Sequence, residues 1–229
     1  MRILLAALTA MSIGGSAAAA TIDAEDMLKS FTVIALGNYE LNSHTPGAVY
    51  VGGDFKAGHS INGGVSNATV GDANGTLIVG GDIIGGGNTT INGNIAVGGS
   101  IMPGTNVNRN NGSIAEGANV PVEDVSTAMR DLSDRLAHMP ETGGETMTGD
   151  RNNPRLNVGP AGSDGVAVIN FGTDDLDLFF GGNPGITFAD GPITTIINIA
   201  GESFHLESGK NFNDFTGANN VIFNFYEAL

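Results

Sequence analysis

The feature that most constrains the fold is a short phrase that occurs twice, and a third time in a weaker form. Residues 51–65 read VGGDFKAGHSINGGV and residues 79–95 read VGGDIIGGGNTTINGNI, while a related VGGSI begins at Val97. Repeats with variable insertions are typical of β-solenoids, in which each coil contributes short strands that pair with the coils above and below. Gly and Asn tolerate positive φ, so they suit the corners between strands. We therefore expect Val51, Val79 and Val97 to share one dry column.

Short apolar segments around these phrases predict strands of three to five residues, at 48–51, 68–70, 76–79 and 94–97. A helical period fails here, because Gly pairs interrupt the segment repeatedly and each Gly costs a helix about 1 kcal/mol relative to Ala. A β-sandwich of hairpins is the other all-β candidate, but it needs regular alternation that occurs here only in patches. The sequence predicts an all-β-dominated fold, a right-handed β-solenoid, with insertions on loops outside the stack.

Residues 119–139 follow a helical period instead. Apolar side chains recur at intervals of three and four, at Val122, Val125, Met129, Leu132, Leu136 and Met139. Pro121 suits the first turn, and Pro140 blocks continuation. We expect one amphipathic α-helix at about 121–139 that packs alongside the solenoid, although such a stripe can also serve to bind a partner.

Shorter segments complete the expected order. Residues 23–30 predict one or two helical turns, and residues 31–36 predict a strand. Residues 141–163 are polar, with Gly and Pro marks that predict a loop. Longer strands that continue the coil are then expected at 165–171, 175–180, 193–199, 203–206 and 220–225.

The first twenty residues, MRILLAALTAMSIGGSAAAA, have the features of a secretory signal peptide. Arg2 supplies the positive start, an apolar run follows it, and Ala18 and Ala20 form the small-residue cleavage site. The alternative is a membrane anchor, but the apolar run is shorter than the roughly 20 residues that span a bilayer. We expect a signal peptide at 1–20, a single domain at 21–229, and export without membrane insertion of the mature chain.

Composition narrows the class of partner. The chain has 9 Lys and Arg against 24 Asp and Glu, which gives a formal net charge of −15. Nucleic acids and anionic lipids are therefore not expected as partners, because both are bound through clustered basic side chains. The chain also has no Cys, so an exported fold must be stabilised by apolar packing and backbone hydrogen bonds rather than by disulfides.

Asp54 and Asp82 follow Gly-Gly at equivalent positions and are weak candidates for calcium ligands. In the calcium-binding nonapeptide, however, three residues separate Asp from the second Gly, whereas here Asp follows it directly. Ser100 also replaces Asp in the third copy. Capping of a corner is therefore the favoured role of these carboxylates, and no cofactor or metal is expected.

A catalytic constellation is not evident. Asp174, Asp175 and Asp177 could form a carboxylate pair for sugar chemistry, but no basic residue stands near them in the sequence. The chain has neither a GxSxG elbow nor a GxxxxGK[ST] loop. The sequence therefore predicts no catalytic residues.

The order of segments resembles the choice-of-anchor A domain. The resemblance is carried by FTVIALGNY at 31–39, the VGGD phrases, the amphipathic helix, IINIAG at 196–201 and VIFNFYEA at 221–228. It covers residues 31–229 and implies an exported bacterial surface protein of the adhesin-like or collagen-binding type, without catalytic residues. Family members continue into further strands and an anchor, so the resemblance also implies a C-terminally truncated domain.

Together these observations predict a non-catalytic, adhesin-like domain that is secreted or associated with the cell surface. The expected partner is an extracellular polymer, such as a collagen-like protein or a polysaccharide, because a solenoid presents long flat faces. Two alternatives share the fold. A carbohydrate-active β-helix enzyme would need Lys or Arg near its acids, and an ice-binding protein would need a regular array of Thr.

Overall fold

A computed structural model of the chain describes residues 22–40, 44–58, 60–62, 67–85, 87–188, 194–201, 215–216 and 220–227. The structure is 45% strand and 17% helix. The strands pair mostly in parallel, which confirms the all-β-dominated prediction. The expected signal peptide with Ala18 and Ala20, and the expected strand at 203–206, lie outside the described residues.

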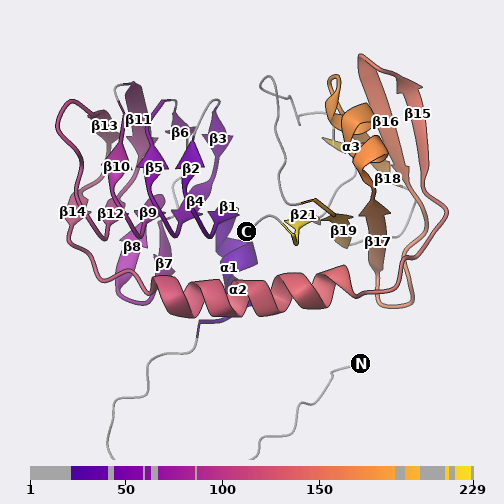
Figure 1. Ribbon diagram of the computed structural model, residues 1–229, viewed down its shortest axis with the longest axis horizontal. Helices are drawn as coiled ribbons and strands as arrows, with labels where there is room; N and C mark the ends of the chain where they lie inside the picture. Colours follow the sequence, from indigo (N-terminus) through magenta and orange to yellow (C-terminus); the bar gives the residue numbers. More distant parts are fainter. Residues whose placement is uncertain are drawn as a thin grey trace, which may run out of the picture.

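The N-terminal strands form three parallel sheets, here called the first stack (Figure 1). Sheet A contains β1 (Phe31–Ala35), β4 (Ala48–Val51), β9 (Leu77–Val79), β12 (Ile95–Val97) and β14 (Ile114–Glu116). Sheet B contains β2 (Tyr39–Glu40), β5 (Phe55–Lys56) and β10 (Ile83–Ile84), and sheet C contains β3 (Thr45–Pro46), β6 (Ile61–Asn62), β11 (Asn88–Asn92) and β13 (Asn106–Asn110). The chain visits A, B and C in rotation, so successive turns of the chain lie one above another.

The register places equivalent residues of the repeated phrase in columns. Val51 pairs with Val79, and Val79 pairs with Val97. All three side chains are completely buried in the cluster between the three sheets. The predicted dry column is confirmed. The insertion before β9 forms a separate hairpin of β7 (Ala68–Val70) and β8 (Ala73–Gly75), outside the three sheets.

The sequence predicts that the C-terminal strands continue the same coil, but they do not extend these sheets. They form two sheets of their own, here called the second stack. Sheet E contains β15 (Thr146–Asp150), β16 (Asn153–Val158), β18 (Gly185–Phe188) and β20 (Phe215–Thr216), and sheet F contains β17 (Val166–Phe171), β19 (Thr194–Ile199) and β21 (Asn220–Phe225). Apart from the antiparallel β15, neighbouring strands are again parallel. The second stack has its own apolar core.

Two local predictions were wrong in this part of the chain. The expected strand at 175–180 is the helix α3 (Thr173–Phe180). Its buried side chains, Leu176, Phe179 and Phe180, are spaced as on one helix face, whereas Leu178 is 41% exposed. The expected loop at 141–163 contains the hairpin of β15 and β16, whose turn is closed because Asp150 accepts hydrogen bonds from two backbone N–H groups.

Helix α2 (Val122–Ala137) confirms the predicted amphipathic helix and runs below both stacks (Figure 1). Val125, Met129 and Leu132 are buried against sheet A and against α1 (Ala24–Ser30). Its C-terminal half contacts β19 and β21 of the second stack. The stripe therefore covers the protein's own core along its length, rather than being left free for a partner.

Candidate functional site

The Asp residues after Gly-Gly lie at one corner of the first stack and bond to the next rung. Asp54 Oδ1 accepts from the backbone N–H of Asp82 at 2.9 Å, and Asp82 Oδ1 accepts from that of Ser100 at 2.8 Å. Asn38 Oδ1 bonds to the Asp54 N–H in the same way, at 2.7 Å. Each side chain thus holds a backbone donor of the following coil, which is the corner-capping role that the sequence favoured.

These carboxylates do not gather around a common point. Among the residues that the structure describes, no group of three His, Asp or Glu side chains is placed to hold a metal ion. The carboxylates succeed one another along the stack, one per rung, and each already accepts from an N–H group. Each carboxylate therefore caps the backbone of the next rung of the stack.

The acids considered for sugar chemistry lie in α3, and two of them, Asp174 and Asp175, are in its first turn. Asp174, Asp175 and Asp177 are exposed. Asp175 Oδ2 accepts from the backbone N–H of Gly172 at 3.1 Å, which caps the helix. Acidic side chains at this position also interact favourably with the helix dipole. Asp175 is thus a cap of α3.

A carboxyl pair that the sequence did not indicate precedes β15. The pKa of Glu141 is raised by desolvation, by a hydrogen bond with Glu145 and by the negative charge of Glu145. A hydrogen bond with the backbone of Asn170 partly offsets this rise. Glu145 Oε2 is buried without a hydrogen-bond partner among the described residues. Only the fold brings both groups together with the Asn170 backbone, so the sequence alone offered no signal for the raised pKa.

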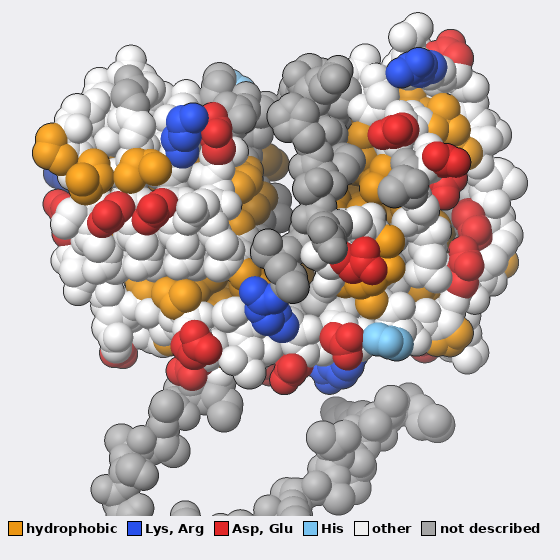
Figure 2. Space-filling model, viewed as in Figure 1, with side chains coloured by type: hydrophobic (Ala, Val, Ile, Leu, Met, Phe, Trp, Pro, Cys, Tyr) orange, Lys and Arg blue, Asp and Glu red, His pale blue; other side chains and the backbone are white. Residues whose placement is uncertain are grey.

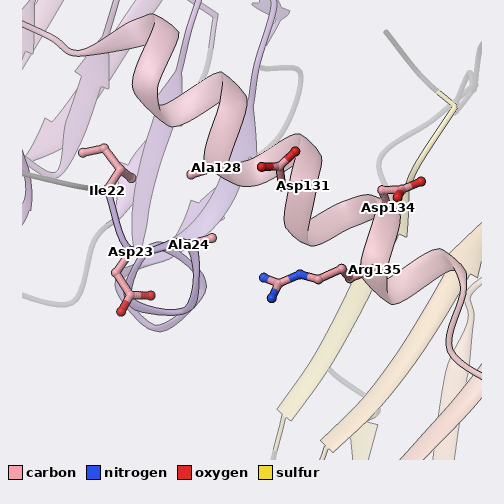
Figure 3. Close-up of a pocket in the computed structure, with 7 residues that line it drawn as sticks. All are labelled: Ile22, Asp23, Ala24, Ala128, Asp131, Asp134 and Arg135. Carbon is pink, nitrogen blue, oxygen red and sulfur yellow. The ribbon is translucent and has the colours of Figure 1, made fainter. Parts of the chain in front are cut away.

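A groove of about 660 Å³ lies between α1 and α2 and is open to solvent (Figure 3). Ile22, Asp23 and Ala24 line one side, and Ala128, Asp131, Asp134 and Arg135 line the other. The carboxylate of Asp23 caps α1, because it accepts hydrogen bonds from two backbone N–H groups of that helix. The residues that line the groove include neither Glu141 nor Glu145.

The most regular surface is the outer side of sheet C. Along β11, the inward side chains Thr89 and Ile91 are completely buried. The outward side chains of β11 and β13 form what we call the amide face: Asn88, Thr90, Asn92, Asn106, Asn108 and Asn110. The register aligns these six side chains as three pairs across the two strands.

The pairs of the amide face differ in how they are bonded. Asn106 Nδ2 donates to Asn88 Oδ1 at 2.5 Å, and Asn110 Nδ2 donates to Asn92 Oδ1 at 3.0 Å. The central pair, Thr90 and Asn108, makes no side-chain hydrogen bond with the other described residues. Its hydroxyl and amide therefore offer donors and acceptors to a ligand, between two fixed flanking pairs. The sequence showed these residues but not that they face the same way.

The visible surface of the first stack in Figure 2 is largely uncharged, but a row of hydrophobic side chains and a row of acidic side chains cross it. Further charged side chains lie along α2 and over the second stack. Sheet B adds one exposed ion pair, in which Lys56 Nζ lies 2.9 Å from Glu40 Oε1. The excess negative charge of the chain is thus unevenly distributed on this view.

Comparison with known proteins places the chain in a family. Residues 24–229 match the family described as "Putative Ice-binding-like adhesive domain". In comparisons with curated proteins and with solved structures, nothing matched the chain. No helix within the described ranges is long and apolar enough to cross a membrane.

Proposed function

Because the chain belongs to the ice-binding-like adhesive domain family, we propose that it is a non-catalytic, adhesin-like domain that binds an extended extracellular polymer. The amide face of sheet C is the proposed contact surface. The observation that supports it is the central pair Thr90 and Asn108, whose side chains are aligned and have no partner among the described residues. The choice-of-anchor A resemblance agrees with the adhesin-like class.

A solenoid architecture gives this surface its shape. We propose that the first stack is a right-handed β-solenoid. The rotation of the chain through sheets A, B and C supports the coil. The strong preference of parallel crossover connections for the right hand supports its handedness. Side chains at equivalent positions then recur every 4.7–4.9 Å along the stack, the usual spacing of neighbouring strands. A repeating surface suits a repeating ligand.

The proposed location is the cell exterior. The signal peptide features at 1–20 support export, and an adhesive domain acts at a surface or outside the cell. Export is tested directly by expressing the full chain with its N-terminal segment. We expect cleavage after Ala20, seen as a mature N-terminus at Thr21 in the secreted fraction. An uncleaved chain retained in the cell would contradict export.

The binding proposal is tested by co-sedimentation of the mature protein with insoluble polysaccharides and with collagen fibres. We expect retention on at least one polymer. The double substitution Thr90→Ala and Asn108→Ala should weaken retention by about tenfold, because two hydrogen bonds of about 0.5–1.5 kcal/mol each are lost. Thr127→Ala, on the exposed side of α2, is the matched control and should bind normally.

Two outcomes would overturn this proposal. If every polymer fails to retain the protein, or if the double variant binds like the unmodified protein, the amide face is not the contact surface. If new reducing or unsaturated ends are released from a polysaccharide, the protein is an enzyme of the carbohydrate-active class, and the raised pKa of Glu141 becomes the first place to look for its acid.

Ice is a second candidate ligand, favoured by the description of the family and by the aligned side chains of the amide face. Outward side chains two residues apart on a strand are separated by about 6.6 Å, and neighbouring strands by about 4.8 Å, which makes a two-dimensional lattice of polar groups. However, the columns combine Asn with Thr, rather than Thr alone. Thermal hysteresis measured in a freezing droplet decides this candidate, and its absence would remove it.

A further inference from the structure

The second stack carries a surface related to the amide face. In the first stack, each of three strands of sheet C is followed along the chain by a strand of sheet A, at β3–β4, β11–β12 and β13–β14. In the second stack, strands of sheet E are followed in the same way by strands of sheet F, at β16–β17, β18–β19 and β20–β21. Sheets A and F both pack against α2. Sheets C and E therefore occupy corresponding positions relative to the same helix.

Helix α2 runs along the stacking direction of sheet F and continues below the first stack (Figure 1). Asn224 Nδ2 on β21 donates to the carbonyl of Ser133, and Asn198 Nδ2 on β19 donates to that of Leu136, at 2.9 and 2.8 Å. Three helical residues rise about 4.5 Å, which nearly equals the spacing of neighbouring strands. The helix thus crosses the strands of sheet F at about one rung per three residues, while Val125 and Met129 pack on the first stack.

The outer side of sheet E carries hydroxyl and amide groups together with the charged side chains of Asp150 and Arg155, which the alternation of the strands places on the same side as Asn157. The register aligns Thr146 with Asn157, and Asn157 with Thr187. Thr146 and Thr187 are exposed, and Asn157 is half-buried. Asn157 Nδ2 donates to the hydroxyl oxygens of Thr146 and Thr148, at 3.3 and 2.9 Å. The amide is thereby fixed, and the Thr146 hydroxyl keeps its own proton available for a ligand.

We infer that the amide face and this part of sheet E form one strip, which binds a single chain of an uncharged polysaccharide along the axis of the stacks. The inference rests on the proposed function and names its ligand class. Sheets C and E contain four strands each, so each sheet contributes about 14 Å to the strip at the usual strand spacing.

Charge and composition select the ligand. The chain has a net charge of −15, yet the strip is lined mainly by neutral Asn and Thr, with one Asp and one Arg on the outer side of sheet E. An anionic polysaccharide would need a basic cluster, which the strip lacks among its described residues. A protein ligand would be expected to meet exposed aromatic or Arg anchors, whereas here hydroxyls and amides face the solvent. These groups match the alternating donors and acceptors of sugar hydroxyls.

The test compares the two sheets on one ligand series. Binding of the mature protein to cellulose, to a β-1,3-glucan and to a galactomannan is measured by depletion from solution, with collagen fibres as the protein ligand. The sheet E variant carries Thr146→Ala and Thr187→Ala, the sheet C variant carries Thr90→Ala and Asn108→Ala, and Thr127→Ala is the control. Melting curves confirm that each variant is folded.

We expect at least one of the three polysaccharides to bind, and each double variant to weaken binding by about five- to tenfold, through the loss of two hydrogen bonds. The variant with all four substitutions should lose binding almost completely. If the sheet E variant binds normally while the sheet C variant does not, the strip is wrong and the proposed function stands. If neither variant differs from the unmodified protein, both fail. Binding to collagen but to none of the polysaccharides would overturn the ligand class.

Discussion

Three glycines lie one above another at the corner where sheet A turns into sheet B. A Cβ atom at Gly80 would overlap the carbonyl oxygen of Gly52, and one at Gly98 would overlap that of Gly80. The second glycines of the phrase are joined rung to rung, since the N–H of Gly81 donates to Gly53 and that of Gly99 to Gly81, both at 2.9 Å. The Gly-Gly phrase is therefore required by close approach of backbones, not by positive φ.

Gly80→Ala should destabilise the protein by about 1–3 kcal/mol, the usual cost of forcing extra atoms into a packed site. The added methyl would meet both the Gly52 carbonyl and the Val122 side chain of α2. Urea unfolding followed by circular dichroism measures the change. Gly37→Ala is the control, because a Cβ there would meet no atom within 4 Å; equal losses in the two variants would contradict the stacking argument.

The carboxylate of Asp82 should act as a cap and not as a metal ligand. Asp82→Ala removes the acceptor for the Ser100 N–H and should lower stability by about 1 kcal/mol, while Asp82→Asn, which keeps an acceptor oxygen, should lower it less. Melting temperatures with millimolar calcium and with a chelator should coincide. A rise with calcium that Asp82→Ala abolishes would instead make Asp54 and Asp82 calcium ligands.

Tyr50 is a buried polar group that the fold leaves without a described partner. Its hydroxyl has no hydrogen-bond partner among the described residues, and burial raises the pKa of Tyr50 to about 12 from an ordinary value of 10.0. Above pH 10 the unfolded chain releases this proton and the folded protein retains it. The contribution of Tyr50 to the free energy of unfolding should therefore be constant below pH 10 and fall by about 1.4 kcal/mol per pH unit between pH 10 and pH 12.

Tyr50→Phe should remove most of this alkaline loss. At pH 7 it should also leave stability unchanged or raise it by about 1 kcal/mol, because an unsatisfied buried hydroxyl disappears while the ring contact with Phe31 stays. Unfolding curves at pH 7, 10 and 11.5 measure both effects. Tyr39→Phe serves as the control, and a steep alkaline loss that persists in Tyr50→Phe would show that another group is responsible.

At the scale of elements, α2 was the easiest to predict from the sequence. Its stripe, its flanking prolines and its acidic first turn all point to the same structure, and the predicted range of about 121–139 agrees with Val122–Ala137. Segments with consistent local signals could be placed closely, such as β4 and β21. In contrast, the Leu-Asp-Leu sequence of α3 has the alternation of a strand. Its helical conformation is evident only in the structure, where Phe179 of α3 packs against Phe171 of β17.

Leu132→Asp tests whether α2 stabilises the fold by burial. Leu132 is 7% exposed in the cluster beneath the helix, so a charge there loses its hydration without gaining a partner. We expect a loss of about 3 kcal/mol or more and a much lower melting temperature. Thr127→Asp adds the same charge on the exposed side and should have little effect. An unchanged melt for Leu132→Asp would mean that the stripe is not buried.

At the scale of the whole molecule, the sequence predicted stacked coils but not two stacks. Repeated phrases report the contacts between successive turns, since the same residues must fit above and below one another. They do not report how far a stack continues, because the separation of sheet E and sheet F from the first stack depends on contacts with α2. One such contact is the row Asn170, Asn198 and Asn224, whose amides are linked across sheet F and end on the helix backbone.

The end of the first stack is marked by charge in positions that are apolar elsewhere. The column Val51, Val79, Val97 continues with Glu116 on β14, and the column Ile61, Ile91 continues with Arg109 on β13. Glu116 Oε2 accepts from the backbone N–H of Ile101 at 2.8 Å. Charged side chains at an open edge disfavour edge-to-edge pairing of sheets. Arg109 and Glu116 should therefore disfavour the addition of a rung from another molecule at this end.

Replacing both charges should make this end adhesive to a second copy of the chain. The double variant Arg109→Ile and Glu116→Val keeps the net charge at −15 and continues both apolar columns to an edge that already exposes Met102 at 43%. Sedimentation velocity over a hundredfold concentration range should show self-association in this variant and none in the unmodified protein. The control, Arg130→Ile with Glu123→Val, makes the same changes on the exposed side of α2. If the end variant sediments like the control, Arg109 and Glu116 do not limit the stack, and its edge must be protected by the twist and shortness of β13 and β14 instead.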